Sequence, residues 1–166
     1  METRNSIVFL RVVAIGFILA LPLVGISFAQ SPISACVKTP EALEGWLAKN
    51  FRYELKMTDD WQTPQETVRL GKGDCDDFAL LAQAVLGDLG IKSDVVILKF
   101  RGLNMLHAIC IWKDRFGYYS FISNQELCRT GKTDIQEAIA KFYPDAENII
   151  FTDQNMRFVK TARINK

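Results

Sequence analysis

The chain is organised around the stretch Gly71-Lys72-Gly73-Asp74-Cys75-Asp76-Asp77-Phe78-Ala79-Leu80-Leu81. Its two glycines loosen the backbone just before a helical pattern begins, so Cys75 falls at the junction of a loop and a helix. The free N–H groups and the dipole of a helix N-terminus favour a thiolate at this position. The stretch therefore predicts a nucleophilic cysteine, with an inert buried thiol as the alternative.

The helix that begins at Cys75 is apolar over more than half of its circumference as far as Leu89, which is typical of a buried helix. Stretches rich in branched and aromatic residues follow at 93–100, 106–112 and 118–123, separated by short turns. Strands joined in this way form an antiparallel meander. The sequence thus predicts an α+β fold in which the buried helix carrying Cys75 packs on an antiparallel sheet.

Capping patterns predict further helices on both sides of this core. Thr39-Pro40-Glu41-Ala42 and Thr63-Pro64-Gln65-Glu66 each combine an N-cap, a proline at the first helical position and an early acid. Another capped helix begins near Thr133-Asp134 and ends before Pro144. Two apolar clusters in the tail, 149–151 and 158–159, are candidates for edge strands.

The first 29 residues have the pattern of an export signal. Arg4 and Arg11 precede an uncharged run over 12–28, and Ser27-Phe28-Ala29 offers small residues to a signal peptidase. Cleavage after Ala29 predicts a periplasmic or secreted domain, residues 30–166, without an integral membrane span. An uncleaved membrane anchor is one alternative, because the run is close to the lower limit for spanning a bilayer.

Lipid anchoring is a second alternative, since Ile33-Ser34-Ala35-Cys36 resembles a bacterial lipobox with Cys36 as the acylated residue. Export also permits disulfides. If Cys75 stays free, Cys36 and Cys128 could bridge the two ends of the domain, with Cys110 as a small apolar strand residue. Lipidation of Cys36 would abolish that bridge.

Composition excludes several classes of partner. The chain has 166 residues, of which 49% are hydrophobic, enough for one ordinary core. Removal of residues 1–29 leaves 18 basic and 18 acidic side chains. This balance gives no electrostatic reason to expect nucleic acid or an anionic membrane surface as a partner.

A candidate catalytic constellation follows from the order of these segments. His107 is the chain's only histidine, so no other imidazole can take a proton from Cys75. Hairpin pairing would bring His107 close to Ser123 and Asn124 at the end of the next strand. A nucleophile, a base and a polar group that orients the base are what thiol catalysis needs. The alternative for His107 is an ordinary half-buried strand residue.

Three segments resemble the transglutaminase-like cysteine peptidases of bacteria, within the broader transglutaminase-like, papain-related fold. These are Trp61-Gln62-Thr63-Pro64-Gln65-Glu66-Thr67, the glycine-rich stretch leading through Cys75 to Ala79, and His107-Ala108-Ile109-Cys110-Ile111-Trp112. The resemblance covers residues 40–127. It implies that Cys75 is the nucleophile and His107 the base of an enzyme that cleaves amide bonds in a protein or peptide.

The third catalytic position departs from the family pattern. The family commonly has an aspartate at a position that here holds Ile122, followed by Ser123 and Asn124. Asparagine orients the histidine in papain-like enzymes, so Asn124 is assigned this role, with Ser123 as the alternative. Without a carboxylate the imidazolium is stabilised less, which predicts a weaker base or a lost activity.

The acids around the nucleophile predict a cation. Asp74, Asp76 and Asp77 suit a helix N-terminus, yet carboxylates beside a thiol raise its pKa. Similar adhesin-cleaving periplasmic members of the family bind calcium at the acids flanking their nucleophile, which correspond to Asp74 and Asp76. The alternative is that these are capping and hydrogen-bonding acids without a metal. Asp77 is expected to accept hydrogen bonds from buried backbone or side-chain donors.

Trp61 is predicted to form a wall of the substrate groove, with core packing beside the Pro64 helix as the alternative. The sequence as a whole predicts an exported cysteine peptidase with the triad Cys75, His107 and Asn124, whose chemistry requires no cofactor. Acyl transfer to amines, as in transglutaminases, is one alternative. A weak or inactive periplasmic module that binds peptides is the other.

Overall fold

A six-stranded antiparallel sheet, in the order β6-β5-β4-β3-β7-β8, forms the centre of the protein. The computed structural model describes residues 36–56, 60–153 and 157–164. The predicted export signal and residues 33–35 of the lipobox lie outside these ranges. Within them, no helix has both the length and the apolar character needed to cross a bilayer.

The predicted meander is confirmed as β3 (Ser93–Phe100), β4 (Leu106–Lys113) and β5 (Tyr119–Ser123). Leu98 of β3 lies opposite His107, and Ser123 at the end of β5 lies opposite Ile109. Pairing therefore places the start of β4 beside the end of β5, as the sequence predicted.

Three further strands extend the sheet. The clusters at 149–151 and 158–159 belong to β7 (Ala146–Thr152) and β8 (Phe158–Arg163). Of these two strands only β8 lies at an edge of the sheet, because β7 pairs with both β3 and β8. The expectation of two edge strands was wrong for β7, whose short apolar run gives no sign of its partners. On the other side, β6 (Glu126–Arg129) pairs with β5 and was not predicted.

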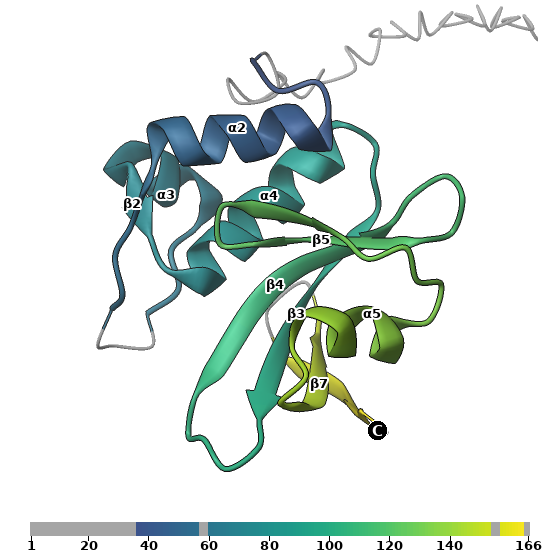
Figure 1. Ribbon diagram of the computed structural model, residues 1–166. Coiled ribbons are helices and arrows are strands. Elements are labelled where there is room, and N and C mark those ends of the chain that lie inside the picture. Colours follow the sequence, from purple (N-terminus) through teal and green to yellow (C-terminus); the bar gives the residue numbers. More distant parts are fainter. Residues whose placement is uncertain (1–35, 57–59, 154–156, 165–166) are drawn as a thin grey trace, which may run out of the picture.

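Helices cover both faces of this sheet (Figure 1). α2 (Pro40–Asn50) and α4 (Cys75–Asp88) share one core cluster with Ala108, Cys110 and Trp112 of β4. The intervening residues Ile109 and Ile111 belong to the opposite cluster, which includes α5 (Ile135–Phe142). The buried α4 confirms the predicted helix-on-sheet architecture, and the period of two along β4 explains why both faces are apolar.

The segment before Cys75 is held by local structure. α3 (Pro64–Leu70) begins with the predicted capping box, in which Thr63 and Glu66 bond reciprocally. It ends at Gly71, whose φ of 64° suits glycine. β1 (Arg52–Tyr53) and β2 (Lys72–Gly73) then pair in parallel. Strands of two residues carry no alternation, so the sequence did not predict them.

Gln125 anchors the turn between β5 and β6. Its side-chain amide donates to the carbonyls of Leu47 at 3.0 Å and Phe51 at 2.8 Å, at the C-terminal end of α2. The two bonds tie the hairpin to the end of α2, where the Leu47 carbonyl also accepts from the backbone amide of Phe51. The end of β5 is thereby fixed next to β4.

The cysteines are four free thiols. The bridge considered between Cys36 and Cys128 is therefore not formed. Cys110 is buried within β4, as expected of a small apolar strand residue.

Candidate active site

Cys75 is the first residue of α4, and the loop before it passes very close to the helix. A Cβ atom at Gly73 would lie 2.7 Å from Cβ of Asp77, a distance that real side chains do not adopt. Glycine at position 73 lets the amide of Asp74 donate to Oδ2 of Asp77 at 3.0 Å. The hydrogen bond from Asp74 to Asp77 thus spans the first turn of α4, next to Gly73.

The thiol of Cys75 is half-buried, and its surroundings act on it in opposite directions. Burial raises its pKa, and the carboxylates of Asp76 and Asp74 raise it further. Hydrogen bonds from the amides of Ala108 and Asp76 to the sulfur lower it. Burial and the two acids prevail, so the pKa of Cys75 lies above that of an ordinary thiol.

His107 is the second residue of β4 and is half-buried. Its Nε2 atom lies 2.9 Å from Oγ of Ser123 and 3.2 Å from the hydroxyl of Tyr143. Nε2 is thus the ring nitrogen that these two hydroxyl groups engage. Burial lowers the pKa of His107, so the neutral imidazole is favoured.

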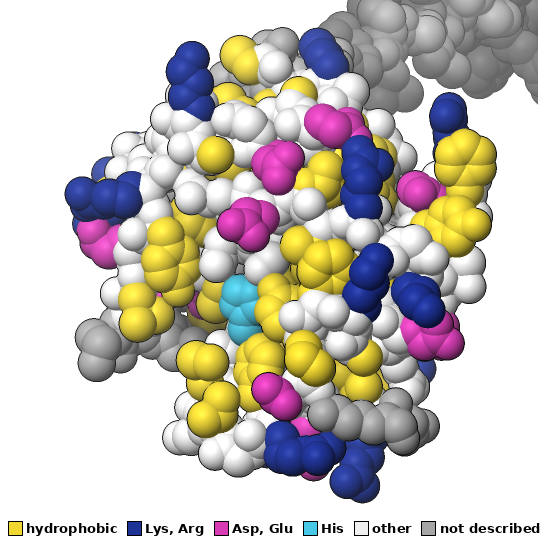
Figure 2. All heavy atoms as spheres, in the orientation of Figure 1, with side chains coloured by type: hydrophobic (Ala, Val, Ile, Leu, Met, Phe, Trp, Pro, Cys, Tyr) yellow, Lys and Arg dark blue, Asp and Glu magenta, His cyan; other side chains and the backbone are white. Residues whose placement is uncertain are grey.

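The backbone at the start of β4 connects the surroundings of Cys75 with those of His107. The sulfur of Cys75 accepts from the amide of Ala108, the residue that follows His107. Figure 2 shows the histidine side chain at the surface, bordered by hydrophobic side chains. Exposed apolar side chains precede it along the chain, namely Leu103, Met105 and Leu106.

Asn124 lies in the two-residue turn between β5 and β6, with a φ of 52°. This left-handed conformation is one that asparagine tolerates better than most residues. Its Oδ1 is buried without a hydrogen-bond partner among the described residues. The hydrogen bonds of the His107 imidazole go to Ser123 and Tyr143 instead. The role of Asn124 in the triad stays a prediction.

Tyr143, the C-cap residue of α5, was missed by sequence reasoning. It lies 36 positions after His107 in the chain. No local pattern links the two residues, since only the packing of α5 against the sheet brings them together.

A pocket of about 220 Å³ borders this site and is lined by Tyr53, Ser123, Asn124, Gln125 and Glu126. Burial raises the pKa of Tyr53, and so does its proximity to Cys75. Because Ser123 lines the pocket and contacts His107, the pocket is a candidate subsite for a substrate side chain.

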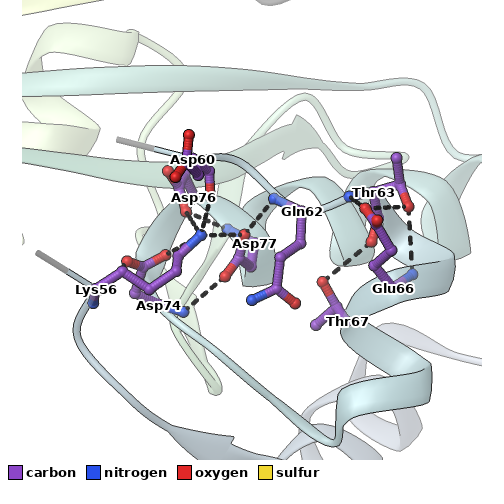
Figure 3. Close-up of polar contacts among 9 residues, drawn as sticks. All are labelled: Lys56, Asp60, Gln62, Thr63, Glu66, Thr67, Asp74, Asp76 and Asp77. Atoms are coloured by element: carbon purple, nitrogen blue, oxygen red, sulfur yellow. Dashed lines mark hydrogen bonds and ion pairs between the residues drawn. The ribbon is translucent and has the colours of Figure 1, made fainter. Parts of the chain in front are cut away.

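Three buried carboxylates, those of Asp74, Asp76 and Asp77, cluster at the N-terminus of α4 (Figure 3). One oxygen each from Asp74, Asp76 and Asp77 lies within 4.8 Å of the others, a spacing that could hold a metal ion. The Nζ atom of Lys56 lies among them, 3.0 Å from Asp77, 3.6 Å from Asp74 and 3.9 Å from Asp76. It also donates to the carbonyl of Asp60.

Asp77 is fully buried and supports buried donors, since Oδ1 also accepts from the amide of Gln62 at 2.8 Å. Lys56 was missed by sequence reasoning because it belongs to a stretch without clear periodicity, far from the acids in the chain. The Lys56 ammonium supplies a positive charge beside these acids.

Asp74 and Asp76 differ in how readily their carboxyl groups ionise. Burial raises the pKa of Asp76 to about 8, and the neighbouring Asp74 and Asp77 raise it in the same direction. Burial also opposes ionisation of Asp74, but hydrogen bonds from Asp76 and from the Lys56 amide lower its pKa. Burial acts against the charge of Lys56, yet its hydrogen bond to Asp77 and the surrounding carboxylates raise its pKa. Of these two neighbouring acids, Asp74 therefore ionises more readily than Asp76.

Trp61 is half-buried and packs against the core cluster that contains α2 and α4. This contact agrees with the packing alternative, while a role in the substrate groove stays a prediction.

The chain matches one protein family in sequence and solved structures in fold. Residues 29–139 match the model of a family described as transglutaminase-like domain. Calcium-bound LapG of Legionella pneumophila has 20% identity and a TM-score of 0.53, over 74% of this chain and 70% of that chain. EGTA-treated LapG of the same organism has 18% identity and a TM-score of 0.52, over 77% and 76% of the two chains. Comparison with curated proteins gives no match.

At these identities the likeness to LapG establishes the fold. The family match covers well over half of the chain and includes both Cys75 and His107. The chain therefore belongs to the transglutaminase-like domain family.

Proposed function

We propose that this protein is a thiol hydrolase, a cysteine peptidase that cleaves an amide bond in a protein or peptide and acts in the periplasm or outside the cell. The observation that carries the proposal is the position of Cys75 at the start of α4. Its sulfur accepts a hydrogen bond from the backbone amide of Ala108, the residue that follows the chain's only histidine. The two LapG structures support the fold on which this chemistry is built.

The proposed reaction uses Cys75 as the nucleophile and His107 as the general base. Nδ1 of His107 takes the thiol proton while the sulfur attacks the carbonyl carbon. The carbon–nitrogen bond then breaks, the proton passes to the leaving amine, and water hydrolyses the thioester. The backbone amide of Cys75, in the first turn of α4, stabilises the oxyanion.

The resting state of this pair is a neutral one. The pKa of Cys75 is raised and that of His107 is lowered, so the proton stays on sulfur until the substrate is attacked. Proton transfer and attack are then coupled. Asn124, the predicted third member, would act on the imidazole by orienting it, and Trp61 would border the bound peptide.

We further propose that calcium binds at Asp74 and Asp76. The donor set fits a hard cation, since Asp77 adds a third carboxylate within 4.8 Å. One LapG structure is of a calcium-bound form. Bound calcium would supply positive charge beside the thiol and lower its pKa. Lys56 lies among the same oxygens, so calcium binding requires its ammonium to move away.

Labelling with iodoacetamide at a pH near neutral tests the nucleophile. With each cysteine followed separately by peptide mapping, Cys75→Ala should remove the label whose rate depends on His107, while Cys128→Ala, which removes another half-buried thiol, should retain it. His107→Asn should slow labelling of Cys75 on the order of 100-fold if the imidazole is its base. Equal labelling of wild type and Cys75→Ala would refute an activated thiol at this position.

Product analysis separates hydrolysis from acyl transfer. Incubation with a mixture of extended peptides should give shorter peptides by mass spectrometry, with Cys75→Ala as the control. Amine adducts formed when a primary amine is added would instead identify an acyl transferase, which shares the same acyl-enzyme. The absence of a carboxylate contact on His107 among the described residues favours the third alternative, a peptide-binding module, and unmodified peptides would support it.

A further inference from the structure

We propose that the hydroxyl groups of Ser123 and Tyr143 together hold the imidazole of His107 in place, in the position where the family pattern has a carboxylate. Both are positioning residues, because they act on the substrate only through His107. The inference rests on the proposed function in that His107 must serve Cys75 as its base.

Nε2 of His107 and the hydroxyl oxygens of Ser123 and Tyr143 form a triangle in which each atom contacts the other two. Ser123 Oγ lies 2.9 Å from Nε2, the Tyr143 hydroxyl lies 3.2 Å from Nε2, and the two hydroxyl oxygens are 2.6 Å apart. The rings of His107 and Tyr143 are also in contact, with centroids 5.6 Å apart and planes inclined at 55°. These contacts restrict both the position and the tilt of the imidazole.

Each corner of the triangle comes from a different element, and each is fixed by its own packing. Ser123 ends β5, where it pairs with Ile109 on one side and Glu126 on the other. Tyr143 follows α5, and its amide donates to the carbonyl of Ile139 at 2.8 Å. Its ring packs against Phe100 and Phe121, with centroids 6.0 and 5.9 Å away. These contacts fix the backbone of Ser123 and the ring of Tyr143 beside Nε2.

The arrangement assigns the tautomer of His107. In the proposed state Nε2 carries the proton and donates to Ser123 Oγ, which also accepts from the Tyr143 hydroxyl. Nδ1 then keeps its lone pair for the thiol proton. Two hydroxyls, unlike a carboxylate, orient the ring without adding charge.

The titratable groups around this triangle are few. Cys75 of α4 and Glu126 and Cys128 of β6 act on Tyr143 through their charges. Among the described residues, no carboxylate shares a hydrogen bond with the imidazole.

The single histidine makes a direct test practical. Two-bond ¹H–¹⁵N correlations on protein without a histidine tag report which ring nitrogen carries the proton, and their pH dependence reports the pKa of His107. Wild type should show the Nε2–H tautomer. Ser123→Ala combined with Tyr143→Phe should populate both tautomers and slow iodoacetamide labelling of Cys75 roughly fivefold, or about 1 kcal/mol.

Conservative variants separate positioning from a general effect on folding. Ser123→Thr keeps the hydroxyl and should retain the wild-type tautomer and labelling rate, and Ser123→Asp should raise the pKa of His107 by supplying a negative charge. Ser120→Ala and Tyr119→Phe, on the same strand but away from Nε2, serve as matched controls and should leave both readouts unchanged. The single variants Ser123→Thr and Ser123→Asp decide the question if the double variant does not fold.

An unchanged tautomer ratio and labelling rate in the double variant would overturn the inference while leaving the proposed function intact. If His107→Asn also labels at the wild-type rate, His107 is not the base and the proposed function itself fails. The two failures are thus distinguished by one set of variants.

Discussion

The ammonium of Lys56 lies 3.0 Å from Oδ1 of Asp77, whose side chain is completely buried. The same ammonium faces Asp74 and Asp76, so one lysine offsets much of the charge of three carboxylates beside the nucleophile. An acid cluster next to a thiol is thereby compatible with a folded helix N-terminus.

Lys56→Met should destabilise the protein by about 3 kcal/mol, because it leaves buried carboxylates without their cation. Urea unfolding measures the loss. If calcium shares these oxygens, it should restore much of the stability of the variant and bind it more tightly than wild type in calorimetry.

Lys72→Met is the matched control, since Lys72 pairs with the partly exposed Glu54 and should contribute less than about 1 kcal/mol. Equal losses from the two variants would contradict a special role for Lys56. If neither wild type nor Lys56→Met gives heat with calcium, the calcium proposal fails.

Stability should fall as the pH rises from about 4 to about 8, because the pKa of Asp76 is raised to about 8 in the folded protein. In this window the folded state holds a proton that the unfolded state has released, so the free energy of unfolding decreases by up to about 1.4 kcal/mol per pH unit from this group. Below pH 4 both states are protonated and the advantage of the folded state is complete.

Asp76→Asn mimics the protonated acid and still offers an oxygen to the amide of Asp77. Its stability should depend less on pH over the same window and should exceed that of wild type at pH 8. Unfolding is measured in urea at several pH values with chelator present. A parallel pH dependence in the two proteins would show that Asp76 is not the titrating group.

Alkylation of Cys75 should require a higher pH than an ordinary thiol, because burial and the charges of Asp76 and Asp74 raise its pKa. Asp76→Asn removes one of these charges and should move the inflection of the rate to lower pH. The exposed Asp145→Asn is the control and should leave the profile in place. A profile for Asp76→Asn at or above that of wild type would be inconsistent with this electrostatic account.

Gly73→Ala should be destabilising by about 1–3 kcal/mol, since the added methyl group would meet the Asp77 side chain at 2.7 Å. Gly45→Ala is the control in the exposed part of α2, where nothing lies within 4 Å of the new atom. It should stabilise the protein by about 0.5–1 kcal/mol through helix propensity. Thermal unfolding of both variants checks the contrast, and a Gly73→Ala protein as stable as wild type would contradict the close approach.

The predictable parts of the structure are those that local pattern specifies. The caps at Thr39 and Thr63, the buried helix from Cys75 and the meander of β3, β4 and β5 all follow from periodicity and turn chemistry, and all were confirmed. β6 and the parallel pair β1–β2 could not be predicted, because strands this short leave no periodic signal.

The sequence by itself determined the family, the helix that carries Cys75 and the pairing that brings His107 to the end of β5, because each depends on neighbours in the chain. Only the tertiary structure decided what surrounds these groups. Lys56 reaches the three acids from a separate segment, and Tyr143 reaches Nε2 from beyond α5. Contacts between distant residues depend on the packing of whole elements, and no local pattern records them.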